Sequence, residues 1–107
     1  MTNTSEFTTM ARIEVVIDAE HIPIIRDLLF AAGAKGYTAL HGVTGYGHSG
    51  SHEGRPIFND RNTLAMLICV APLDRIDPIV AGVRQMLEDH HGVLMVSDTK
   101  VSRADYF

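Results

Sequence analysis

One order of elements (strand, helix, strand) occurs twice in this chain, and this repetition limits its possible folds more than any other feature. Residues 12–17 alternate between apolar and polar side chains, which predicts a strand, and residues 37–43 predict a second one. Between them, apolar residues recur at helical spacing from Ile22 to Ala32, and Gly33 follows as a helix stop.

The second half follows the same order after a long loop. Residues 63–70 predict a strand, a helix begins after a cap at Asp74, and residues 93–101 predict a last strand. This order is typical of a ferredoxin-like βαβ-βαβ sandwich, an α+β fold with a four-stranded antiparallel sheet and two helices on one face. We expect a single such domain over residues 11–107, preceded by a flexible tail at residues 1–10.

The strand at 63–70 is apolar on both faces, although two helices can cover only one face of a sheet. Val16, Leu94 and Val96 add to this surplus of apolar side chains. A sheet face of this kind would leave a large apolar patch in water. We therefore expect a homo-oligomer with closed rotational symmetry, either a dimer or a trimer.

Composition narrows the class of protein. Hydrophobic residues make up 46% of the chain and charged residues 21%, as in ordinary globular domains. Nine basic and thirteen acidic residues give a net charge of −4, which argues against a nucleic-acid binder that relies on a basic face. The single Cys69 lies in an apolar run, and residues 1–9 lack the pattern of a secretion signal, so we expect a cytoplasmic protein.

A glycine-rich segment follows the second predicted strand. Gly45, Gly47 and Gly50 match the spacing G-x-G-x-x-G, but residues 51–56 cannot open the helix that a dinucleotide fingerprint requires. Two interpretations stay open: a turn whose backbone N–H groups approach an anion, or a flexible turn without a ligand. Arg61, Lys100 and Arg103 lie near strand ends, where they are either anion ligands or surface charges.

Six histidines raise the question of a metal site. His48 and His52 lie four residues apart, but the glycines around them argue against the helix that this spacing needs. His90 and His91 suit the negative end of a helix, and His41 lies in a strand. We interpret these histidines as surface and capping residues and predict no metal site. No catalytic set is visible either, so we predict no enzymatic activity.

Two short motifs carry a resemblance to a known family. The segment from Gly36 to Thr38 opens the second strand, and the segment from Val43 to Gly47 closes it. Together with the order of elements, these motifs resemble the PII signalling superfamily, in particular the PII-like proteins linked to inorganic carbon uptake and carboxysomes.

The resemblance implies a homotrimer with three adenine-nucleotide sites in the clefts between subunits. It also implies that residues 47–60, between the second and third strands, form the T-loop, which changes shape with ligand and docks on a partner. The residues that match the family's nucleotide site fall into four groups: Val16, Thr38 and Val70 near the adenine; Gly45 and Gly47 at the T-loop base near the phosphates; Gly92 in the B-loop; and Arg103 in the C-terminal segment.

Departures from the family refine the expected ligands. The family's B-loop has a lysine that grips the phosphates, and here Val93 occupies that position. Because the outer phosphate loses a charged partner, we expect ADP or AMP to be the ligand rather than ATP. The T-loop has no tyrosine, and the glutamine and lysine that serve 2-oxoglutarate are absent. Nitrogen sensing of that type is therefore not supported.

These observations predict a non-enzymatic sensor, with ADP or AMP as ligand and bicarbonate as a second effector by resemblance. His48, Ser49 and Arg61 are the candidate residues for the second anion. The expected partner of the T-loop is a protein or a membrane transporter, and the expected location is the cytoplasm, in association with carboxysomes. The alternative is a metal-binding trimer of the divalent-cation-tolerance type, which would use the histidine-rich loop.

Overall fold

The computed structural model describes residues 6–45 and 63–107. Four strands and two helices account for most of them, and three short 3-10 turns complete the path. The strands are β1 (Thr8–Asp18), β2 (Thr38–Val43), β3 (Leu64–Ala71) and β4 (Gly92–Val101), and the helices are α1 (Ile22–Ala31) and α2 (Ile76–Leu87). The 3-10 turns are Ala19–His21, Leu73–Arg75 and Ala104–Tyr106.

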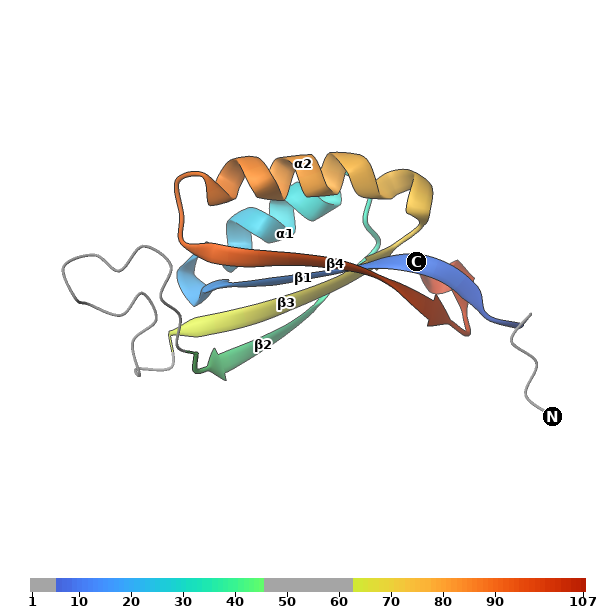
Figure 1. Cartoon of the computed structure of the whole chain (residues 1–107), viewed down its shortest axis with the longest axis horizontal. Helices are drawn as coiled ribbons and strands as arrows, with labels where there is room; N and C mark the ends of the chain where they lie inside the picture. Colours follow the sequence, from blue (N-terminus) through green and yellow to red (C-terminus); the bar gives the residue numbers. More distant parts are fainter. Residues whose placement is uncertain (1–5, 46–62) are drawn as a thin grey trace.

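The strands form one sheet in the order β2-β3-β1-β4, and every neighbouring pair is antiparallel. Both helices cover the same face of this sheet, as Figure 1 shows. The predicted ferredoxin-like α+β fold is confirmed. No helix of the described residues is long and apolar enough to span a membrane.

The core lies between the sheet and the helices. Ile13, Val15 and Ile17 alternate along β1 and are fully buried against the helical layer. Cys69 on β3 pairs with Ile13 and is buried as well. Ile25 and Leu29 from α1 and Ile79 and Val83 from α2 close this core from the other side. Burial of these aliphatic side chains, each contributing about 1.5–3 kcal/mol, fixes which sheet face the helices cover.

Two element boundaries differ from the sequence interpretation. β1 begins at Thr8 rather than residue 12, and Met10 is only 5% exposed, so residues 8–10 belong to the sheet and not to a tail. Pairing with β4 provides the hydrogen bonds that the local sequence did not suggest. Asp74 does not cap α2: it lies within the 3-10 turn before that helix, and the N-cap position is Arg75.

Gly82 has a packing role in α2. A Cβ atom added at this position would collide with Cδ2 of Leu28 on α1. The glycine therefore permits close approach of the two helices, which outweighs its low helix propensity.

The second face of the sheet carries no helix. Its residues follow from the strand register, since residues paired across antiparallel strands point to the same side. Leu40, Val93 and Met95 are between 42% and 49% exposed on this face. The apolar residues of the open face are Val16, Leu40, Met66, Ile68, Val70, Val93 and Met95.

The prediction that Leu94 and Val96 belong to the open face is wrong. Leu94 pairs with Val15 and Val96 pairs with Ile13, both of which point toward the helices. The surplus of apolar side chains is nevertheless present, because their neighbours on β4 supply it.

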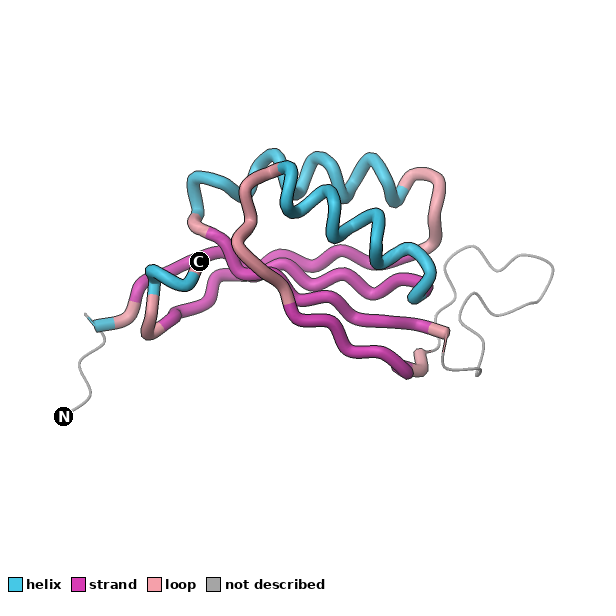
Figure 2. Tube along the Cα trace, turned by 180° about the vertical axis from the view of Figure 1, so that it is seen from behind, coloured by secondary structure: helices cyan, strands magenta, loops and turns pink. Residues whose placement is uncertain are grey.

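β1 and β4 continue beyond the rest of the sheet. The last β1–β3 pair is Ala11 with Ala71, whereas the β1–β4 pairing continues to Thr8 and Val101. This two-stranded extension projects away from the helical layer, and Figure 2 shows the C-terminal turn folded beside it. The described part of the molecule therefore has two distinct ends, one with the extension and one where β2 ends and β3 begins.

Candidate functional site

The structure brings Val16, Gly45 and Gly92 to the loop end of the sheet. β2 ends at Val43, two residues before Gly45, and Gly92 pairs with Ile17 at the end of β1. Three of the predicted nucleotide-site residues therefore share one end of the molecule.

Gly92 lies in a tightly packed place. A Cβ atom there would come within 2.8 Å of Cδ2 of Leu87, 2.9 Å of the Val16 carbonyl oxygen and 3.3 Å of Cγ1 of Ile17. The backbone carbonyl cannot move aside without disturbing β1. Glycine is thus required here by packing, independently of any phosphate contact.

Val93 follows Gly92 in β4, and its side chain lies on the open face. It pairs with Val16 across β1 and β4 and is 43% exposed. An isopropyl group at this point offers neither a charge nor a hydrogen-bond donor to an anion. Val93 occupies the position where the family resemblance expects a lysine. The structure places its side chain on the open face, in contact with solvent.

Thr38 and Val70 lie together on neighbouring strands of the open face. Thr38 pairs with Ile68, two residues from Val70, and its side chain is exposed while Val70 is half-buried. Val70 pairs with Arg12, four residues along β1 from Val16. At about 3.3 Å per residue, Val16 is roughly 13 Å farther along the sheet. Within one chain, these three residues form a strip rather than a pocket.

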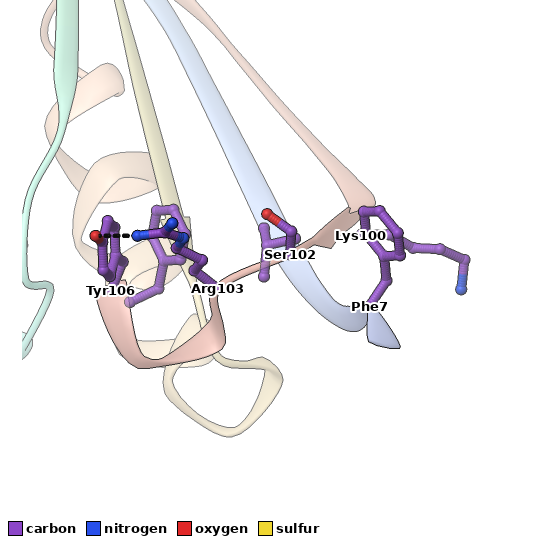
Figure 3. Close-up of a pocket in the computed structure, with 7 residues that line it drawn as sticks. Phe7, Lys100, Ser102, Arg103 and Tyr106 are labelled. Carbon is purple, nitrogen blue, oxygen red and sulfur yellow. Dashed lines mark hydrogen bonds between the residues drawn. The ribbon is translucent and has the colours of Figure 1, made fainter. Parts of the chain in front are cut away.

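Arg103 lies at the opposite end, in the C-terminal segment. Its Nη1 donates a hydrogen bond of 2.7 Å to the hydroxyl oxygen of Tyr106, and its guanidinium carbon is 5.4 Å from the centre of the same ring. Figure 3 shows these two side chains at one side of an open hollow and Phe7 and Lys100 at the other, with Ser102 between them. The hollow has a volume of about 420 Å³, and two basic groups line it.

The distance between Arg103 and Gly92 determines how a nucleotide site can form. Gly92 is the first residue of β4 and Arg103 lies two residues beyond its last residue, Val101; the nine steps along the strand alone amount to roughly 30 Å at about 3.3 Å per residue. One nucleotide is far too short to contact both in a single chain. A site that uses both residues must take them from two copies of the chain.

The remaining predicted residues lie outside the described part of the chain. They belong to the loop and its base: Gly47, His48, Ser49 and Arg61. Their assignment to phosphate or to a second anion stays a prediction.

One juxtaposition was missed in the sequence. His90 was expected only to suit the negative end of a helix, yet the fold brings its ring against that of His21. The expected ferredoxin-like topology could have predicted this contact, because the end of β1 and the start of β4 are neighbours in such a sheet.

The sheet order and the two helices on one face define a ferredoxin-like α+β protein with an open sheet face. The family model of nitrogen regulatory protein P-II matches residues 10–106. The chain belongs to this family. No curated protein matches the chain by sequence.

Solved structures agree with this assignment. The chain is similar to CPII from Thiomonas intermedia K12 bound to ADP, AMP and acetate, at 32% identity and a TM-score of 0.78, over 94% of this chain and 96% of that one. A structure of the same protein with ADP and bicarbonate gives 29% identity and a TM-score of 0.79 over the same shares. A PII-like signalling protein from Thermus thermophilus is 15% identical over 94% of this chain and 97% of that one, with a TM-score of 0.72, and shows the shared fold alone.

Proposed function

We propose that this protein is a non-enzymatic, cytoplasmic regulator that binds ADP or AMP in the clefts between the subunits of a homotrimer. The observation that carries this proposal is its 32% identity, over 94% of its length, to a protein whose structure contains ADP and AMP. The proposed nucleotide site consists of Val16, Thr38, Gly45, Gly47, Val70, Gly92 and Arg103.

Two structural features support clefts between subunits. The open face of the sheet exposes apolar side chains that water would disfavour and that a second copy would cover. Arg103 and Gly92 lie at opposite ends of β4, so only neighbouring subunits can bring them to one ligand. The hollow with Lys100 and Arg103 at the C-terminal end of one subunit would then face the end of the next subunit that carries Gly45 and Gly92. The two surfaces together would form one nucleotide site.

Calorimetric titration of the nucleotide-free protein with AMP, ADP and ATP tests this proposal. We expect saturable binding of ADP and AMP with one site per chain. If none of the three nucleotides gives binding heat or displaces another of them, nucleotide sensing is refuted. A stoichiometry of one nucleotide per three chains would instead contradict the cleft assignment.

We further propose bicarbonate as a second effector and residues 47–60 as the T-loop. CPII has been solved with ADP and bicarbonate together, and this supports a pair of ligands. His48, Ser49 and Arg61 are the candidate anion ligands. If the first ligand already meets part of the cost of ordering the loop, the second binds more tightly.

Hydrogen exchange across residues 47–60 tests this coupling with nucleotide alone, bicarbonate alone, both and neither. We expect the strongest protection with both ligands. Equal exchange in all four conditions would remove the switch and leave a nucleotide-binding trimer. The proposed output is regulation of inorganic carbon metabolism or transport, through docking of the T-loop on a protein or a membrane transporter, in association with carboxysomes.

A further inference from the structure

We propose that Asp18, Glu20, His21 and His90 form a binding site for a divalent transition-metal cation, with Zn²⁺ as the probe of choice. This site is distinct from the histidines of the long loop and goes beyond the proposed nucleotide function. Two carboxylates and two imidazoles provide its donor atoms.

The fold brings these side chains together from two separate segments. Asp18 is the last residue of β1, and the 3-10 turn Ala19–His21 leads from it into α1. His90 follows the end of α2, two residues before β4 begins. Because Ile17 pairs with Gly92, the end of β1 lies against the start of β4.

The donor atoms converge. One ligand atom each from Asp18, Glu20 and His21 lies within 4.8 Å of the others. The Nε2 atom of His21 is 3.6 Å from Oε1 of Glu20. The ring centroids of His21 and His90 are 4.2 Å apart, with the rings inclined at 46°. The second imidazole therefore adjoins His21 although it comes from a distant part of the chain. Its nitrogens lie outside the group formed by Asp18, Glu20 and His21, so the His90 side chain must turn toward that group to complete the site.

These separations suit one small cation after a modest closure. Donors about 2.1 Å from a tetrahedral Zn²⁺ lie roughly 3.4 Å from one another, so a pair at the 4.8 Å limit must approach by about 1.4 Å. Glu20 can supply that movement, because its side chain is 76% exposed. The side chain of His21 is only 21% exposed, so this ligand has little freedom to move.

The types of donor determine the class of metal. Imidazole nitrogens favour Zn²⁺, Ni²⁺ and Cu²⁺, whereas Mg²⁺ and Ca²⁺ prefer sets made of oxygen atoms alone. Two carboxylates also balance the charge of a divalent cation, which makes partial removal from water less costly. We therefore expect Zn²⁺ to bind and Mg²⁺ not to compete with it.

Titration of the full-length, nucleotide-free protein with Zn²⁺ by calorimetry tests the site. We expect one Zn²⁺ per chain and an affinity at least tenfold lower in His90→Gln and in Glu20→Gln. The matched control is the double variant His48→Gln/His52→Gln, which removes two loop histidines and should bind Zn²⁺ as the wild type does. Bound Co²⁺ should give visible absorption bands that the His90→Gln variant loses.

Unchanged Zn²⁺ affinity in both single variants would overturn the proposal, as would loss of binding in the loop double variant alone. Circular dichroism shows whether His90→Gln folds, and Glu20→Gln alters only an exposed side chain, so a folding defect cannot hide the answer. ADP titration of the same samples separates the two proposals. If the protein binds ADP but not Zn²⁺, only the metal site is refuted. If it binds Zn²⁺ but not ADP, only the nucleotide function is refuted.

Discussion

Gly92 illustrates how packing alone can require a glycine that the family resemblance also predicts to lie near phosphate. Its hydrogen atom faces the carbonyl oxygen of Val16, where a methyl group would have no room. The proposed phosphate contact is thus not needed to explain why this position is a glycine. Substitutions at this position therefore affect stability before they affect ligand binding.

We expect Gly92→Ala to lower the free energy of unfolding by about 1–3 kcal/mol, because overpacking forces backbone or side chains to shift. Urea denaturation measures the change. Gly36→Ala is the matched control, since a Cβ there meets nothing within 4 Å. Equal losses in the two variants would show that the contact at Gly92 is not the cause.

Cys69 is the second residue with a definite consequence. Burial raises the pKa of its thiol, and its Sγ lies 3.4 Å from the Gly36 carbonyl oxygen that accepts its hydrogen bond. The unfolded chain thus loses this proton at a lower pH than the folded chain. The stability that the thiol contributes is complete below about pH 8.5 and declines as the pH rises toward the folded pKa.

Unfolding free energies at pH 7 and pH 10 for the wild type and Cys69→Ala check this linkage. The wild type should lose more stability than the variant between the two pH values, because only the wild type has the thiol. Parallel losses would mean that other groups, such as lysines and tyrosines, account for the whole effect.

At the scale of elements, we expect the start of β4 to determine the proposed preference for ADP or AMP over ATP. Val93 lies on the open face beside Val16, at the glycine-lined end of the sheet. A lysine there would place an ammonium group where phosphates are proposed to lie. The strand itself need not change, because the position is 43% exposed.

We expect wild-type protein to bind ADP and AMP at least as tightly as ATP, and Val93→Lys to raise the ratio of ATP to ADP affinity about tenfold, or 1.4 kcal/mol. Calorimetry measures both affinities. Ser97→Lys adds the same charge to the same face of β4, about 13 Å away, and should leave the ratio unchanged. A wild type that already prefers ATP tenfold would contradict our interpretation of this position.

At the scale of the whole molecule, the sheet is covered on one side only. The helices bury the alternate residues of β1 and β3, and the opposite face keeps a band of apolar side chains in contact with solvent. A monomer with such a face would be prone to associate. This asymmetry is the main structural argument for a symmetric assembly.

Light scattering at micromolar concentration should give three times the 11.7 kDa of one chain. Leu40→Glu should dissociate this assembly, because the carboxylate would be buried against apolar side chains. Ile24→Glu is the control: Ile24 is 46% exposed on α1, against 49% for Leu40, but it lies outside the open face. A stable wild-type monomer would refute the trimer and the nucleotide clefts together.

The sequence by itself determined the order of elements and the fold class, since hydrophobic periodicity is a local property that each strand and helix carries separately. It also indicated that β3 is apolar on both faces. The two short motifs, from Gly36 to Thr38 and from Val43 to Gly47, indicated the family by resemblance, together with the order of elements.

Only the tertiary structure decided which side chains meet. The strand register assigns Leu94 and Val96 to the helical face, pairing with β4 draws residues 8–10 into the sheet, and the crossing of the helices explains Gly82. The proximity of His21 and His90 likewise follows from antiparallel pairing of β1 with β4. Such contacts join residues far apart in the chain, so no local pattern encodes them, and their energies depend on the packing of the whole molecule.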